Sequence, residues 1–95
     1  MYVIVRTKSF ENSYKKLKRS GTLSAKTKQK LERAIDMLAT GKRLSKEYKD
    51  HNLLGELKNY RECHIKGDVL LVYQRIQKEL VLILVDVGSH SELFG

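Results

Sequence analysis

Hydrophobic and polar positions in the first half of the chain predict one strand followed by two amphipathic helices. The β-branched run at residues 2–6 is typical of a short strand. An apolar residue recurs every three or four positions from Phe10 to Leu17, which predicts a helix. Ser9 is a suitable N-cap for this helix, and the Ser-Gly step at residues 20–21 is a suitable stop.

A second helix is predicted from about residue 24 to residue 40. Leu31, Ile35 and Leu38 recur at spacings of four and three residues and form its apolar stripe. Gly41 follows as a C-terminal stop. Because the loop between the two helices is short, we expect an antiparallel helical hairpin.

The second half of the chain predicts three strands in sequence. Residues 42–56 have no clean period and are interpreted as a connecting loop, whereas residues 59–65, 69–76 and 80–87 read as strands separated by short turns. The last two strands are apolar at almost every position, which indicates burial on both faces. Helices can cover one face, so we expect the C-terminal segment, the 42–56 loop or a partner protein to cover the other.

These elements predict an α+β fold in the order β-α-α-β-β-β, with a helical hairpin packed on a mostly antiparallel sheet. A length of 95 residues fits a single domain over residues 1–95. The periodicity does not show where the first strand joins the sheet.

The charge divides the chain into two unequal halves. Residues 1–49 hold 14 Lys and Arg against 4 Asp and Glu, a balance of +10, whereas residues 50–95 hold 5 against 7, a balance of −2. The three histidines lie in the second half. This pattern suggests a surface that binds a polyanion beside a possible proton-transfer site, although a solvated basic surface has the same composition.

The cysteine content and the apolar runs indicate the cell compartment. Cys63 is the single cysteine, so an internal disulfide is excluded and a reducing, cytoplasmic location is expected. The N-terminus lacks the long apolar run of a signal peptide, and the longest apolar stretch, residues 80–85, is too short to span a bilayer.

The histidines are candidates for chemistry, although each taken alone is more often an ordinary surface residue. By strand alternation His64 shares a face with Tyr60 and Glu62, while Cys63 and Ile65 point to the core on the other face. His90 directly follows the last strand, between a serine and a glutamate at capping-box spacing, and His51 lies in the predicted loop.

No metal or cofactor is expected. The histidines lack HxxxH or HxH spacing, there is no second cysteine, and no glycine-rich phosphate loop is present. A basic protein with three histidines could instead cleave RNA without a metal, because the RNA's own 2′-OH can attack the adjacent phosphate. Imidazoles, a carboxylate and a cation supply the base, the acid and the charge neutralisation for this reaction.

Five motifs stand out in the second half of the chain. They are Tyr48-Lys49-Asp50-His51, a leucine–glycine step at Leu54, Tyr60-Arg61-Glu62-x-His64, Asp68-x-x-Leu71-Val72-Tyr73 and Gly88-Ser89-His90-Ser91-x-Leu93-Phe94-Gly95. In combination they resemble the YafQ-type toxins of the RelE/ParE superfamily of bacterial toxin–antitoxin systems. The resemblance covers nearly the whole chain.

The resemblance implies a RelE-like, ribosome-dependent mRNA endonuclease that cuts the codon in the ribosomal A site and arrests translation. It also implies a cognate antitoxin protein that holds the toxin inactive. In such toxins the positions of His51, His64 and His90 handle protons or contact the scissile phosphate, that of Asp68 accepts a proton or orients a histidine, and that of Phe94 stacks on a base of the codon.

The resemblance also assigns the cations. Many members have an arginine where this chain has Asp86, so Arg61, Lys49 or a ribosomal group would have to neutralise the phosphate charge. Relatives can have an aromatic residue where this chain has Val69. Six basic side chains of the predicted helices would bind ribosomal RNA phosphates without reading sequence: Lys15, Lys18, Arg19, Lys26, Lys30 and Arg33.

Two other functions stay open from the sequence. A non-enzymatic inhibitor, like the gyrase-poisoning branch of the superfamily, is disfavoured because that branch usually lacks this histidine set. An RNA-binding or ribosome-binding module with weak or lost catalysis is suggested by Asp86. Salt-sensitive ribosome binding without cleavage would distinguish the module from the enzyme.

Overall fold

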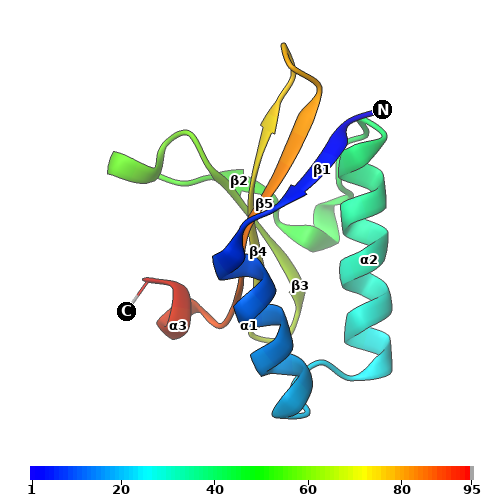
Figure 1. Ribbon diagram of the computed structural model, residues 1–95, viewed down its shortest axis with the longest axis vertical. Helices are drawn as coiled ribbons and strands as arrows, with labels where there is room; N and C mark the ends of the chain where they lie inside the picture. The colour runs from blue at the N-terminus through cyan, green and yellow to red at the C-terminus, as the bar shows by residue number, and fades with distance from the viewer. Residues whose placement is uncertain (95) are drawn as a thin grey trace.

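The computed structural model describes residues 1–94 and has the predicted α+β architecture (Figure 1). It contains two main helices, a five-stranded sheet and three short helical segments. The elements are β1 (Val3–Arg6), α1 (Lys8–Arg19), α2 (Ala25–Ala39), the 3₁₀ turn η1 (Lys46–Tyr48), β2 (His51–Asn52), the 3₁₀ turn η2 (Gly55–Leu57), β3 (Arg61–Lys66), β4 (Val69–Ile76), β5 (Val81–Gly88) and α3 (His90–Phe94).

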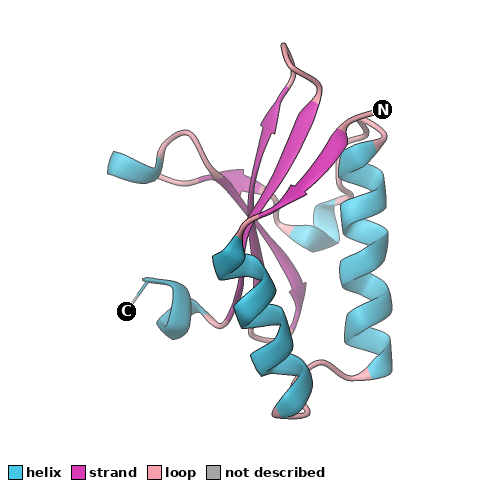
Figure 2. Ribbon diagram, viewed as in Figure 1, coloured by secondary structure: helices cyan, strands magenta, loops and turns pink. Residues whose placement is uncertain are grey.

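The five strands form one sheet in the order β1-β5-β4-β3-β2, and Figure 2 shows the strands in magenta. The strand β1 runs parallel to β5 at one edge, while the other three pairings are antiparallel. The mostly antiparallel sheet is therefore confirmed. The predicted loop over residues 42–56 differs, because His51 and Asn52 form the additional short strand β2, which pairs with β3. The position of β1 is set by a pairing between residues nearly 80 positions apart in sequence, which no local pattern reveals.

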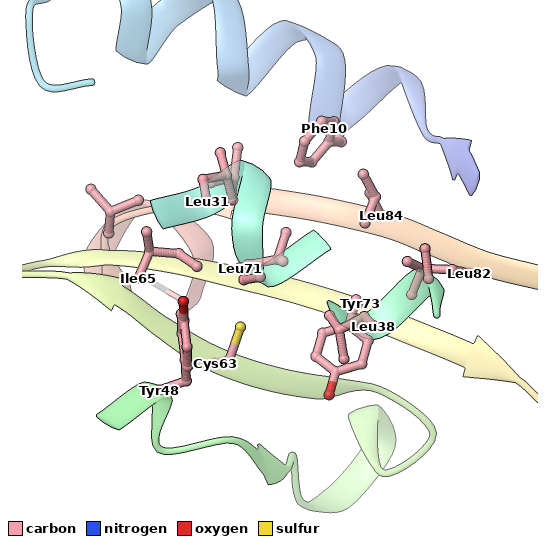
Figure 3. Close-up of a cluster of buried hydrophobic side chains, with 14 of the residues drawn as sticks. Phe10, Leu31, Leu38, Tyr48, Cys63, Ile65, Leu71, Tyr73, Leu82 and Leu84 are labelled. Atoms are coloured by element: carbon pink, nitrogen blue, oxygen red, sulfur yellow. The ribbon is translucent and has the colours of Figure 1, made fainter. Parts of the chain in front are cut away.

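The helices α1 and α2 run in opposite directions and cover one face of the sheet (Figure 1). Helix α1 packs on β5 and α2 packs on β3. Figure 3 shows the core that they enclose, where Phe10 and Leu31 from the helices meet Leu71 and Leu84 from the strands. The apolar stripes predicted from the sequence are thus the faces that are buried.

The start of α1 differs from the prediction, because Thr7 and not Ser9 is the N-cap. The Thr7 hydroxyl accepts a hydrogen bond from the Phe10 N–H at 3.0 Å and donates to the Val85 carbonyl at 2.7 Å, so it ties the helix start to β5. Ser9 lies inside the first turn of α1. In contrast, α2 begins where the sequence predicts, and Ser24 is its N-cap, accepting a hydrogen bond from the Thr27 N–H at 3.2 Å.

The opposite face of the sheet also holds buried side chains. Leu70 and Val72 on β4 are 3% and 5% exposed, which confirms the prediction that this strand is buried on both faces. The same prediction is wrong for β5, because its residues 81–85 alternate between partly exposed and buried positions. On this part of the fold, α3 packs against β5 and the short strand β2 pairs with β3. The C-terminal segment is therefore one cover of this face, whereas the 42–56 region contributes Tyr48 to the core and extends the edge of the sheet through β2.

The buried thiol of Cys63 gives a first testable consequence. Burial raises the pKa of Cys63 from 9.0 to about 12, so the folded state keeps this thiol protonated after the unfolded chain has begun to ionise. The stability that this protonation contributes is present below pH 9 and is lost as the pH rises towards 12. We expect Cys63 to react with a thiolate-directed reagent at pH 8 at least about 100-fold more slowly in the native than in the urea-unfolded protein. Equal rates would contradict the buried position.

Candidate active site

Pairing of β2 with β3 brings two histidines to the same carboxylate. His51 pairs with Glu62 across the strands, and His64 follows Glu62 by two residues, so all three lie on one face of the sheet. The Oε1 atom of Glu62 is 3.8 Å from His51 Nε2 and 3.5 Å from His64 Nε2, and the imidazole ring centroids are 6.3 Å apart. We call these three residues the His–Glu–His cluster.

Glu62 is the member of this cluster to which sequence reasoning gave no role. It is only 5% exposed, whereas the side chains of His51 and His64 are 50% and 38% exposed. A buried carboxylate between two accessible imidazoles can fix both ring orientations and balance the charge that either ring gains on taking up a proton. The sequence did contain a signal for this role: Glu62 precedes His64 by two positions in a predicted strand, so the two side chains share a face of the sheet.

The orientation of His51 is set by its own loop. Its Nδ1 atom lies 2.7 Å from the Lys49 carbonyl oxygen, so an Nδ1–H can donate there and leave Nε2 towards Glu62. Lys49 has a φ of 48°, in the left-handed region that non-glycine residues rarely adopt, and it turns the chain into β2 at this point.

A second cluster fastens this loop to the sheet. Asp50 accepts hydrogen bonds from Arg61 Nη2 at 2.8 Å and from the Tyr73 hydroxyl at 2.5 Å, and Arg61 also donates to Asn52. Tyr73 is 1% exposed, and burial together with its bond to Asp50 raises the pKa of its hydroxyl. Asp50 therefore joins the segment before His51 to both β3 and β4, a positioning role that the sequence did not indicate.

The helix α3 carries the remaining aromatic groups of the site. Ser89 and Glu92 form the predicted capping box, with the Ser89 N–H donating to Glu92 at 2.9 Å and the Glu92 N–H donating to Ser89 at 3.2 Å. These bonds lower the pKa of Glu92. The rings of His90 and Phe94 are 5.2 Å apart, one helical turn from each other.

One cleft joins the two parts of the site. It has a volume of about 410 Å³ and is lined by His51 and Glu62 from the sheet and by His90 and Phe94 from α3. Segments nearly 40 residues apart in sequence thus surround one space, which we call the histidine cleft. His64 lies next to the histidine cleft, because its Nε2 is 3.5 Å from Glu62, which lines the cleft.

Asp68 lies apart from the histidine cleft. It is exposed in the turn between β3 and β4 and lines a neighbouring cavity with Ser89 and Glu92. Among residues 1–94 no hydrogen bond or ion pair joins Asp68 to a histidine. Its proposed role as a proton acceptor stays a prediction.

The predicted cations near the site differ in availability. Lys49 is exposed, whereas the guanidinium of Arg61 is paired with Asp50.

The two positions where this chain departs from many relatives have structural roles. The Asp86 carboxylate accepts hydrogen bonds from the hydroxyls of Ser9 at 2.8 Å and Ser13 at 2.6 Å, and these bonds anchor α1 to β5. Val69 is buried in the core and offers no surface on which a base could stack.

The predicted RNA-binding cations are mostly exposed on α1 and α2. Lys15, Lys18, Arg19, Lys26 and Arg33 are exposed. Lys30 is the exception, because its ammonium lies 3.6 Å from Glu47 and 5.3 Å from the Tyr48 ring centroid. The helices thus present a basic surface with five of the six predicted cations.

The part of the chain that the structure describes lacks two kinds of feature. Over residues 1–94, no group of three or more His, Cys, Asp and Glu side chains has an arrangement suited to a metal ion. In the same range, no helix has the length and hydropathy that crossing a bilayer requires.

Comparison with known proteins decides the family. The family model described as the bacterial toxin YafQ of type II toxin–antitoxin systems matches residues 2–95. The chain belongs to the YafQ toxin family. The mRNA interferase toxin YafQ of Escherichia coli strain K12 is 42% identical over 48 residues, which are 50% of this chain and 50% of that relative. The matched region spans about half the length of the curated relatives.

Solved toxin structures match nearly the full length of the chain. A metal-bound toxin from Helicobacter pylori is 46% identical, with a TM-score of 0.86, covering 99% of this chain and 100% of that one. The DinJ–YafQ complex of Escherichia coli contains a chain that is 27% identical, with a TM-score of 0.85 and complete coverage of both chains. The fold assignment and the recognised family are therefore confirmed.

Proposed function

We propose that this YafQ family member is an endoribonuclease that cuts mRNA in the ribosomal A site and so stops translation. The observation that carries the proposal is the His–Glu–His cluster, which lies beside a cleft lined by His90 and Phe94 on a protein of net charge +8. The similarity to a relative named an mRNA interferase toxin supports the same reaction class. RNA is the polyanion that combines a phosphate backbone with an internal nucleophile.

The proposed reaction uses the RNA 2′-OH. One imidazole removes the 2′-OH proton, O2′ attacks the adjacent phosphorus, and the bond from phosphorus to the 5′-oxygen breaks. A second imidazole, protonated, gives its proton to the leaving 5′-oxygen, which leaves a 2′,3′-cyclic phosphate and a 5′-OH. His51 and His64 suit these paired roles because Glu62 can balance the positive charge on whichever ring is protonated.

The remaining site residues receive supporting roles. Phe94 is proposed to stack on a base of the codon and His90, 5.2 Å away, to contact the phosphate or its leaving group. Lys49 is proposed as the main protein cation near the phosphate, because Arg61 is already paired with Asp50. Asp68 is proposed as a further proton acceptor or orienting group that would approach the histidines only when RNA is bound.

The partners follow from the same proposal. The exposed cations of α1 and α2 would bind ribosomal RNA phosphates, and a cognate antitoxin would hold the toxin inactive, as the DinJ–YafQ complex of a 27% identical chain suggests. The site of action is then the cytoplasm, where ribosomes translate.

Charge reversal on the helices tests the interaction with the ribosome. We expect the Lys15→Glu/Lys18→Glu variant to bind ribosomes more weakly, with the slope of log K against log salt reduced by roughly 1 for each phosphate that is no longer neutralised. Sedimentation binding at several salt concentrations measures this slope. Lys78→Glu, in the exposed turn between β4 and β5, serves as the control. An unchanged slope in the double variant would remove these lysines from the interface.

Expression in a cell without antitoxin tests the proposed function as a whole. We expect growth arrest and mRNA 5′ ends that fall in phase with codons. Normal growth with intact mRNA would contradict the proposal. DNA damage without mRNA cleavage would favour the non-enzymatic inhibitor, and ribosome binding without cleavage would favour the inactive RNA-binding module.

A further inference from the structure

Two leucines of the η2 region are exposed beside the histidine cleft. Leu54 is 89% exposed and Leu57 is 39% exposed, whereas half of the leucines of the chain are buried. Single exposed apolar residues are common on protein surfaces, but neighbouring ones that line a cleft with polar catalytic candidates are typical of a ligand site.

The two leucines face the same space as the aromatic ring of α3. Figure 1 shows η2 and α3 projecting from the sheet on the side opposite α2. Leu54 and Leu57 line the histidine cleft from the η2 region, and His90 and Phe94 line it from α3, with Glu62 on the sheet between them. The cleft thus has an apolar wall on each side and acid–base groups from the strands.

The wall formed by the η2 region is braced by its own backbone. The Leu53 N–H donates to the Tyr60 carbonyl at 3.0 Å, and the Tyr60 N–H donates to the Leu57 carbonyl at 2.9 Å. The Asn52 side chain adds a bond to the Lys58 carbonyl at 3.3 Å. These bonds close the loop on itself, so the leucines are held outward before any ligand arrives and little entropy is lost on binding.

We propose that Leu54 and Leu57 form the second wall of a nucleobase site, so that one base of the mRNA is held between these leucines and the Phe94 ring. A base has two flat apolar faces, and both lose their neighbours when the base is taken out of a stack. A volume of about 410 Å³ lies within the range of small-molecule sites and can hold one nucleotide. This inference rests on the proposed function, because it takes RNA as the ligand.

Methyl NMR on the full chain tests the two-walled site without requiring cleavage. The probe is an RNA trinucleotide with 2′-O-methyl groups, which cannot be cut. We expect saturable upfield shifts of the Leu54 and Leu57 methyls, with one common Kd that also describes the Phe94 ring signals. The Leu80 methyls, 49% exposed in the turn between β4 and β5, are the internal control and should not shift. Shifts at Phe94 alone, or shifts at Leu54 and Leu57 no larger than at Leu80, would overturn the proposal.

Substitution gives the second measurement. The Leu54→Ala/Leu57→Ala variant is expected to raise the Kd for the trinucleotide about 10-fold, whereas Leu80→Ala leaves it unchanged. Leu54→Ala alone, at an almost fully exposed position, is the variant to use if the double variant does not fold. An unchanged Kd in either folded variant would overturn the second wall.

The two proposals fail in different ways. If the leucine methyls shift with the same Kd as the Phe94 ring signals, but unmodified mRNA on ribosomes is not cleaved, the endonuclease proposal is contradicted and the base site is supported. Cleavage with unaffected leucine methyls would keep the endonuclease and contradict the second wall.

Discussion

Replacing His64 by glutamine is expected to slow mRNA cleavage about 100- to 10,000-fold while the protein stays folded. Glutamine keeps a polar side chain on β3 but cannot exchange a proton near neutral pH. The His64 side chain is 38% exposed and its Nε2 lies 3.5 Å from the buried Glu62, so the substitution removes the proton carrier without opening the core.

Single-turnover cleavage on saturating ribosomes measures the effect. Lys66→Gln is the matched control, because Lys66 is exposed at the end of the same strand. We expect the His51→Gln/His64→Gln variant to lose less than the product of the two single losses, because the two rings act as one unit on Glu62. A His64→Gln variant that cleaves within about threefold of the unmodified protein would exclude His64 from proton transfer.

Replacing Asp50 by alanine is expected to lower the free energy of unfolding by about 2 kcal/mol, and the melting temperature by about 10 °C. The substitution leaves the buried Tyr73 hydroxyl and the Arg61 guanidinium without their acceptor. We expect less than the loss for a fully buried ion pair, since the side chain of Arg61 is 38% exposed. Cleavage should also fall, because β2 has only two residues and Asp50 fastens the chain directly before His51.

Urea unfolding of Asp50→Ala, Tyr73→Phe and the double variant measures the coupling. The double variant should cost less than the sum of the single changes, since each removes the same hydrogen bond. Asp36→Ala, at an exposed position of α2, is the control. A free energy of unfolding for Asp50→Ala within about 0.5 kcal/mol of the unmodified protein would show that this cluster does not fasten the loop.

The fold could be predicted where the pattern is local. The helix α2 has an apolar stripe and a serine cap in adjacent positions, so its bounds follow from the sequence. The position of β1 could not be predicted, because a parallel edge pairing with β5 leaves no local signature. The N-cap at Thr7 was missed for a similar reason, since its hydroxyl also donates to Val85 near the far end of the chain.

The candidate site, like the fold, could be predicted only where the pattern is local. Alternation along β3 put Glu62 and His64 on one face, but the approach of His51 depends on a two-residue strand with no periodic pattern. The role of Asp86 could not be predicted either. Its carboxylate is satisfied by serines of α1, and it adjoins a register shift between β4 and β5 that interrupts the alternation.

The measurement that tests the proposed chemistry most directly is cleavage of a single defined codon on purified ribosomes. Two mRNAs are compared, one with an unmodified ribose 5′ to the scissile phosphate and one with a single 2′-deoxy substitution there. We expect the purified chain to cut the first mRNA, leaving a 2′,3′-cyclic phosphate, and to leave the second intact. An uncut unmodified mRNA, or equal cleavage of the deoxy mRNA, would contradict the proposed function of the His–Glu–His cluster.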